Sequence, residues 1–179
     1  ALVFFNQCEP KTDEFKPESG TLDLTKYVAV GNSLTAGMAD GELYRSGQEN
    51  SIPAIIAKQF AYVNNSLLFN QPLMKDDLGL GKKLILGYTT DCANNTSLAP
   101  VLAGGTPDLA GNTANIYANG PFQNMGVPGA KSFHVNYAGY AMANPYFGRF
   151  ASSTTATILH DAVQQKPTFF TLWIGNNDV

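Results

Sequence analysis

A serine follows a short apolar run near the start of the chain. Residues 27–30 are aromatic, β-branched or small, which is typical of a buried strand, and Gly31 and Asn32 allow a sharp turn after it. Such a turn exposes the next side chain at the edge of a sheet. A serine hydroxyl held there can attack a carbonyl carbon once a base accepts its proton, so Ser33 is a candidate nucleophile. The pattern also fits an ordinary strand that enters a loop, and the GxSxG motif is not met because Thr35 replaces its second glycine.

Two later stretches also combine an apolar run with a compact polar turn. Residues 123–132 contain Pro128-Gly129, which suits a tight turn and leaves the Gly129 N–H open to a ligand. Residues 167–174 are almost continuously apolar, as in a central parallel strand, and Gly-Asn-Asn-Asp follows at 175–178.

Helical signals lie between these stretches. Asn50 or Ser51 can cap a helix through about residue 63, with Pro53 in its first turn. Ser152 or Ser153 is expected to cap a second helix through about residue 165.

The alternation of strands, turns and helices predicts an α/β fold with three layers, α/β/α, and a parallel central sheet. In such folds the functional sites lie at the carboxyl ends of the strands.

Residues 64–122 are low in charge and rich in glycine and proline, and within them only Lys83 to Thr89 is strand-like. A loop-rich insertion of this length in an enzyme usually shapes the substrate site, and the alternative is a partly disordered surface excursion. Gly79-Leu80-Gly81-Lys82-Lys83 lacks the spacing of a phosphate-binding loop, so no nucleotide cofactor is expected.

Composition limits the possible partners. The 179 residues are 44% hydrophobic, enough for the core of one domain, and the net charge of −3 argues against nucleic acid as a partner. Two distant histidines, His134 and His160, and the lack of His or Cys clusters argue against a metal site. No apolar run reaches the length of a membrane span.

The first 25 residues read as a segment separate from the domain at 26–179. An apolar start ends at Cys8, and a charged, proline-containing stretch follows, as in the signal-peptide remnant and flexible tether of a bacterial lipoprotein. This resemblance implies lipidation of Cys8 and export to the cell envelope of a Gram-negative bacterium. A disordered N-terminus with a free Cys8 is the alternative, and Cys8 could also pair with Cys92.

The turns at 31–34, 127–130 and 175–178, in this order, resemble the sequence blocks of the SGNH hydrolases, also called GDSL-type esterases or lipases. The first reads GNSL in place of GDSL, the second matches the oxyanion-glycine block, and the third fits GxND. The resemblance extends from Tyr27 to Asp178 and implies a flavodoxin-like α/β fold.

The resemblance makes Ser33 the nucleophile. It assigns the N–H groups of Ser33 and Gly129 and the Asn177 side-chain amide to the oxyanion hole, where each donor lowers the barrier by about 3 kcal/mol. Asp178 is expected to form structural hydrogen bonds, and Asn32 replaces the acidic residue of GDSL while keeping its turn.

The family's DxxH block, which carries the base and its orienting acid, is absent, and neither histidine has its context. The sequence is therefore expected to be the N-terminal portion of a serine ester hydrolase, incomplete at its C-terminus and with little turnover.

The expected substrate is a small-molecule, glycan or lipid ester, and the sequence indicates no oligomeric state. The rival hypotheses are a non-catalytic ligand-binding lipoprotein on the same fold and a structural domain of the cell envelope.

Overall fold

Three parallel strands form the centre of the domain in the computed structural model, which describes residues 16–179. Their order is β4 (Asn124–Gly126), β1 (Tyr27–Gly31) and β5 (Phe169–Trp173), so β1 lies between the other two. Gly31 aligns with Gly126 on one side and with Trp173 on the other. Because all three strands are parallel, their carboxyl ends lie at one edge of the sheet. The chain is therefore a mixed α/β protein, as its sequence predicts.

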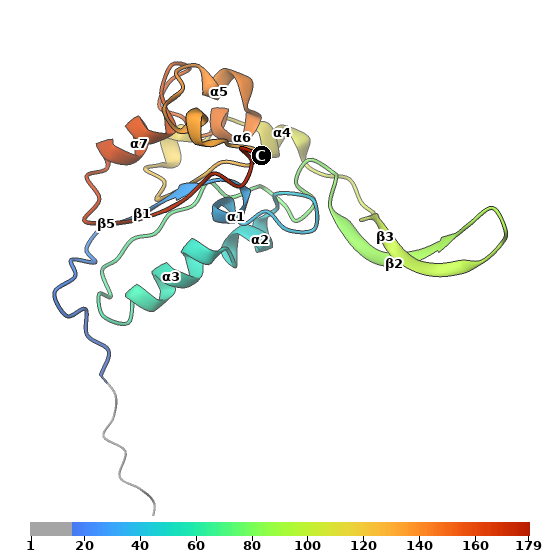
Figure 1. Cartoon of the computed structure of the whole chain (residues 1–179), viewed down its shortest axis with the longest axis horizontal. Helices are drawn as coiled ribbons and strands as arrows, with labels where there is room; N and C mark the ends of the chain where they lie inside the picture. The colour runs from blue at the N-terminus through green and yellow to red at the C-terminus, as the bar shows by residue number, and fades with distance from the viewer. Residues whose placement is uncertain (1–15) are drawn as a thin grey trace, which may run out of the picture.

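Strand β1 is buried along its whole length because helices pack on both sides of it (Figure 1). Tyr27 and Ala29 point to the side of α3 (Ile52–Phe60), where they pack with Ala57. Val28 and Val30 point to the opposite side and belong to a larger apolar cluster that includes residues of α7 (Ile158–Gln164). This burial on both faces explains why apolar and polar residues do not alternate along the strand.

The two longest helices differ in how well their starts are predicted. Helix α3 begins as expected, because the Ser51 hydroxyl accepts a hydrogen bond from the Ala54 N–H at 3.3 Å and proline lies in the first turn. The cap predicted at Ser152 or Ser153 is wrong. Thr157 caps α7 by accepting from the His160 N–H at 3.0 Å, while Ser152 hydrogen bonds with Asp161 instead.

The remaining helices contain three to five residues each. They are α1 (Ser33–Ala36), α2 (Arg45–Glu49), α4 (Leu109–Thr113), α5 (Tyr140–Ala143) and α6 (Pro145–Gly148), together with the 3-10 helices η1 (Tyr117–Asn119) and η2 (Ser132–Asn136).

The insertion at 64–122 contains two strands, not the single strand predicted. Strand β2 (Leu84–Thr90) matches the expectation, and β3 (Thr96–Leu102) pairs with it antiparallel, with Leu86 opposite Pro100. Proline within β3 concealed the strand in the sequence, because proline removes a backbone donor and is confined to strand edges. The hairpin extends away from the domain (Figure 1).

A buried carboxylate attaches the insertion to the domain. Glu42 is 1% exposed, and its Oε2 accepts hydrogen bonds from the N–H groups of Leu80 and Lys82. Its Oε1 accepts from the Tyr146 hydroxyl at 3.1 Å, and burial together with the Glu42 charge raises the pKa of Tyr146. The segment at 80–82 is thus held by hydrogen bonds to Glu42, and the Leu80 side chain packs against the cluster that contains Leu43 and Met74.

The prediction of a central position for residues 167–174 is wrong for the part of the sheet that the structure describes. There β5 is an outer strand, and Phe170 and Leu172 are 63% and 57% exposed. Apolar sequence alone cannot distinguish a strand covered on both faces from one whose apolar side chains remain exposed.

Gly126 allows α1 to lie directly against the end of β4, and its replacement tests this contact. A Cβ atom at Gly126 would lie 2.7 Å from the Ala36 Cα, whereas a Cβ at Gly104 would meet no atom within 4 Å. We expect Gly126→Ala to lower the free energy of unfolding by about 1–3 kcal/mol through overpacking. Gly104→Ala is the matched control and should change it little. Urea denaturation measures both, and equal stabilities would contradict the close packing.

Candidate active site

Main-chain hydrogen bonds join the carboxyl ends of the three strands. The Asn32 N–H donates to the Trp173 carbonyl at 3.1 Å, and the Val127 N–H donates to the Gly31 carbonyl at 2.9 Å. The three turns singled out in the sequence therefore start side by side at one edge of the sheet, as expected for a site in an α/β fold.

Ser33 is the first residue of α1, directly after the turn that ends β1, and it is half-buried. The Asn32 side chain caps this helical turn, because its Oδ1 accepts a hydrogen bond from the Leu34 N–H at 3.0 Å. The serine is thus positioned by its backbone, and its neighbour Leu34 is exposed.

Asn32 has a second role that the sequence did not predict. Its side chain is 1% exposed, and its Nδ2 donates to Oδ1 of Asn176 at 3.1 Å. One buried amide therefore caps the Ser33 turn and links it to the turn after β5. Asn176 was missed as a site residue, and its only sequence signal was its place beside Asn177.

Gly129 occupies the left-handed region, with φ of 78°, in the exposed turn after β4. A glycine suits this backbone conformation, and open space surrounds the position of its missing Cβ. Within residues 16–179 no protein acceptor takes a hydrogen bond from the Gly129 N–H. The N–H is therefore unpaired within these residues, and its role as a donor to a ligand stays a prediction.

Asn177 is half-buried and connects the second and third turns. Its Nδ2 donates to the Ala130 carbonyl at 2.9 Å. A side-chain amide has two N–H hydrogens, so one is used by the Gly129 turn and the other has no protein acceptor within residues 16–179.

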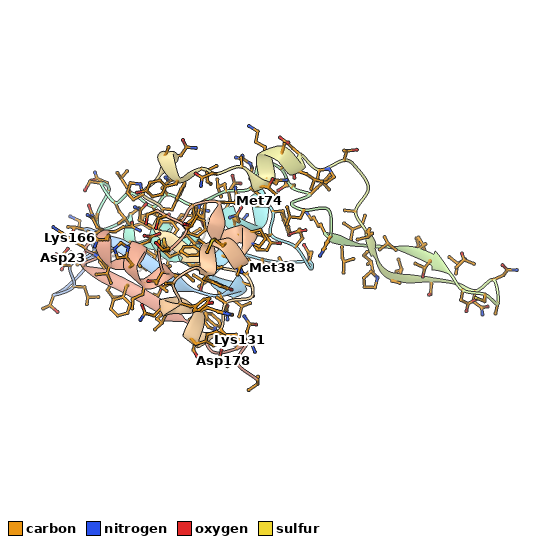
Figure 2. The ribbon with its side chains drawn as sticks, turned by 90° about the horizontal axis from the view of Figure 1, so that it is seen from above. Asp23, Met38, Met74, Lys131, Lys166 and Asp178 are labelled. Carbon is orange, nitrogen blue, oxygen red and sulfur yellow. The ribbon has the colours of Figure 1, made fainter. Side chains whose placement is uncertain are left out.

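Asp178 has the structural role expected of it. Its Oδ1 accepts a hydrogen bond from the Ser132 N–H at 2.8 Å. Hydrogen bonds from the Ser132 hydroxyl and N–H hold the pKa of Asp178 below its ordinary value of 3.8, and the charge of Lys131 acts in the same direction. Figure 2 shows Lys131 and Asp178 next to each other.

Within the described residues neither histidine hydrogen bonds with Ser33. His134 accepts a hydrogen bond from the Lys131 N–H at its Nδ1, and its ring stacks on Tyr140 with centroids 4.1 Å apart. His160 is exposed on α7, with its Nδ1 3.2 Å from Asp161 Oδ1. No hydrogen bond joins the Ser33 hydroxyl to a base within the described residues.

Ser152, Asp161 and His160 lie together, but not in the arrangement of a nucleophile and its base. The Ser152 hydroxyl donates to Asp161 Oδ1 and does not contact the imidazole. In a catalytic triad the histidine lies between the serine and the acid, so this group is best explained as a structural anchor for α7.

A cavity of about 810 Å³ lies elsewhere in the domain, lined in part by Lys26, Gln123, Phe150 and His160. Lys26 and Gln123 directly precede β1 and β4, so the cavity lies toward the amino ends of these strands. The three turns lie at the opposite ends, and the cavity is therefore separate from Ser33.

Comparisons with protein-family models, curated proteins and solved structures give no match for this chain. The candidate site therefore depends on residue chemistry and geometry alone.

Within residues 16–179 no three or more His, Cys, Asp and Glu side chains are arranged to hold a metal ion. In the same residues no helix is long and apolar enough to cross a membrane. Cys92 is exposed with a free thiol, whereas Cys8 and the predicted lipidation site lie outside the described part of the chain.

The buried Asn32 amide generates a stability prediction. Asn32→Ala leaves the Leu34 N–H and the Asn176 carbonyl without their partner, so we expect a loss of about 1–3 kcal/mol in the free energy of unfolding. Asn50→Ala is the control, because Asn50 is exposed and makes one hydrogen bond, to the Ser46 carbonyl. Thermal and urea unfolding would compare the two variants, and an equal effect would show that Asn32 does not link the turns.

Proposed function

We propose that this chain carries the nucleophile and the oxyanion donors of an SGNH-type serine ester hydrolase with a three-layer α/β/α fold. The observation that supports this proposal is the set of hydrogen bonds between the three turns. Asn32 links the Ser33 turn to the third turn, and Asn177 links the third turn to the Gly129 turn. The Ser33 and Asn177 side chains and the N–H groups of Ser33 and Gly129 thus belong to one connected edge of the sheet.

In the proposed reaction the Ser33 oxygen attacks the carbonyl carbon of a carboxylic ester. The developing negative charge on the carbonyl oxygen is stabilised by the N–H groups of Ser33 and Gly129 and by the Asn177 amide. The alcohol leaves and water then hydrolyses the acyl-enzyme, so this chemistry requires no cofactor. Small-molecule, glycan and lipid esters all have the reacting group that it needs.

A general base must accept the Ser33 proton, and His134 and His160 do not fit this role. His134 uses Nδ1 to accept from the backbone and stacks on Tyr140, while His160 lies beside Asp161 on α7. We therefore propose that the base comes from outside residues 16–179.

A second candidate function is ligand binding without catalysis on the same fold. It is favoured by the lack of a hydrogen-bonded base at Ser33 within the described residues. In that case the Gly129 and Asn177 donors would hold a carbonyl or carboxylate group without any attack on it.

Covalent labelling distinguishes the two functions. In the natural gene product we expect a fluorophosphonate probe to label Ser33 and Ser33→Ala to abolish the adduct, which intact-mass spectrometry would detect. Ser152→Ala is the control and should leave labelling unchanged, because Ser152 hydrogen bonds with Asp161. Asn177→Ala should slow labelling about 10²–10³-fold by removing one oxyanion donor. Labelling that persists in Ser33→Ala would remove Ser33 from the mechanism, and no labelling at all would favour ligand binding.

We also propose that the protein is exported to the cell envelope and attached through a lipidated Cys8. This proposal depends on the apolar start and the charged tether in the sequence. Fractionation of the natural protein should place it with membranes, and Cys8→Ala should release it into the soluble fraction. Cys92→Ala is the matched control and should remain with the membranes. If Cys8→Ala also remained there, Cys8 would not be the anchor.

A further inference from the structure

The β2–β3 hairpin extends from the domain and is attached to it mainly at its base (Figures 1 and 2). There the Leu84 N–H donates to the Asp40 carbonyl at 2.8 Å, and the Lys83 ammonium lies 3.6 Å from the centre of the Tyr44 ring. A two-stranded hairpin that stands alone in water is only marginally stable. Additional strands or a covering surface would stabilise this one.

One face of the hairpin is apolar and uncharged. Side chains alternate between the two faces of a strand, so Leu84, Leu86 and Tyr88 share a face with their partners Leu102, Pro100 and Leu98. Leu86 and Tyr88 are 72% and 74% exposed, and Leu98 and Leu102 are also more than half exposed. Neither strand contains a charged residue. A contiguous exposed surface of this kind is typical of an interaction site.

The two outer edges of the hairpin differ in their ability to pair with another strand. The Ala103 N–H donates to the Lys83 carbonyl, and the Asp91 N–H donates to the Asn95 carbonyl. Odd-numbered residues of the two strands therefore hydrogen bond to each other across the hairpin. In an antiparallel ladder, hydrogen-bonded pairs of residues alternate with pairs that are not hydrogen-bonded to each other. The N–H and carbonyl groups of the even-numbered residues therefore point outward, away from the partner strand.

On the β3 edge one outward position is Pro100, which has no N–H to donate. Proline is one of the devices that protect the edge of a sheet from further pairing. On the β2 edge the outward positions beyond Leu84 are Leu86, Tyr88 and Thr90, and all of them retain an N–H. Within residues 16–179 the main-chain groups of Leu86 and Tyr88 form no hydrogen bond with other parts of the protein. The β2 edge is therefore open.

We propose that the open β2 edge pairs with the β2 edge of a second copy of this chain. The two strands run antiparallel about a twofold axis near Gly87, so that two hairpins form one four-stranded sheet. A twofold interface places the same surface on both partners, which requires a self-complementary patch. The uncharged strands meet this requirement, because no like charges face each other across the axis.

The size and the chemistry of the hairpin favour this partner. A strand of seven residues is about 24 Å long, and apolar side chains cover one face of it on both strands. Pairing of the two β2 edges joins the copies through main-chain hydrogen bonds and places the two apolar faces next to each other as one continuous face of the four-stranded sheet.

The tip disfavours a lipid membrane as the partner. It contains Asp91, Asn94 and Asn95, flanked by threonines, and the leucines lie nearer the base. Insertion tip-first would place the polar residues in the hydrocarbon, where unpaired polar groups are costly.

The test is the oligomeric state of the full 179-residue chain, and it does not depend on the proposed hydrolase function. Sedimentation velocity over a range of concentrations should show a reversible dimer. Leu86→Pro removes an outward N–H from the β2 edge, so its dimer dissociation constant should rise about tenfold or more, because the lost bond occurs twice in a twofold dimer. Leu98→Pro is the matched control, since it makes the same substitution on the edge that Pro100 already interrupts, and it should remain dimeric.

A second measurement tests the arrangement even if Leu86→Pro disturbs the hairpin. In a Cys8→Ser variant, spin labels on Cys92 should lie about 30–40 Å apart, because antiparallel pairing points the two tips in opposite directions. A monomer at all concentrations, equal dissociation constants for Leu86→Pro and Leu98→Pro, or labels in contact would each overturn the proposal. Binding of the monomer to neutral phosphatidylcholine vesicles would also overturn the proposal and would indicate a membrane as the partner.

Discussion

The close approach of three strand ends is the constraint on which the rest of this structure depends. Gly31 has room for no side chain, because a Cβ there would come within 2.8 Å of the Thr35 Cβ and closer still to the Trp173 carbonyl. That closeness allows the Asn32 N–H to reach the Trp173 carbonyl. The buried Asn32 amide then reaches Asn176, and the turn that holds Ser33 is fixed relative to its neighbours. Backbone geometry, more than side-chain packing, assembles the candidate site.

Features with a local physical cause could be predicted from the sequence. The apolar run before Gly31 is a strand, and Ser51 with Pro53 starts a helix, because caps and the fixed φ of proline act within a few residues. The open N–H of Gly129 is also local, since it follows from the turn itself. The meeting of the three turns follows from a topological rule for parallel sheets.

Features that depend on distant partners could not be predicted. Glu42 is buried because it accepts N–H groups some forty residues away, and no pattern around it in the sequence indicates this. Arg149 is likewise buried, where its guanidinium donates to the Pro72 and Leu73 carbonyls, and burial lowers its pKa to about 10. Thr157 replaced the predicted caps because Ser152 found a partner in Asp161. In each case a long-range or competing hydrogen bond decided the outcome.

The pairing of β1 with β5 also has a consequence for how the protein folds. Lys26 contacts Thr168 across 142 positions of sequence, and β1 pairs with β4 across almost a hundred. Sheets built from such distant segments form slowly, because the entropy of closing long loops is lost before the contacts stabilise the chain. During synthesis the Ser33 turn emerges long before β5, the strand whose Trp173 carbonyl bonds to the Asn32 N–H. A chain that is still being made therefore exposes β1 without either of its neighbours, and the candidate site cannot assemble before β5 has been made.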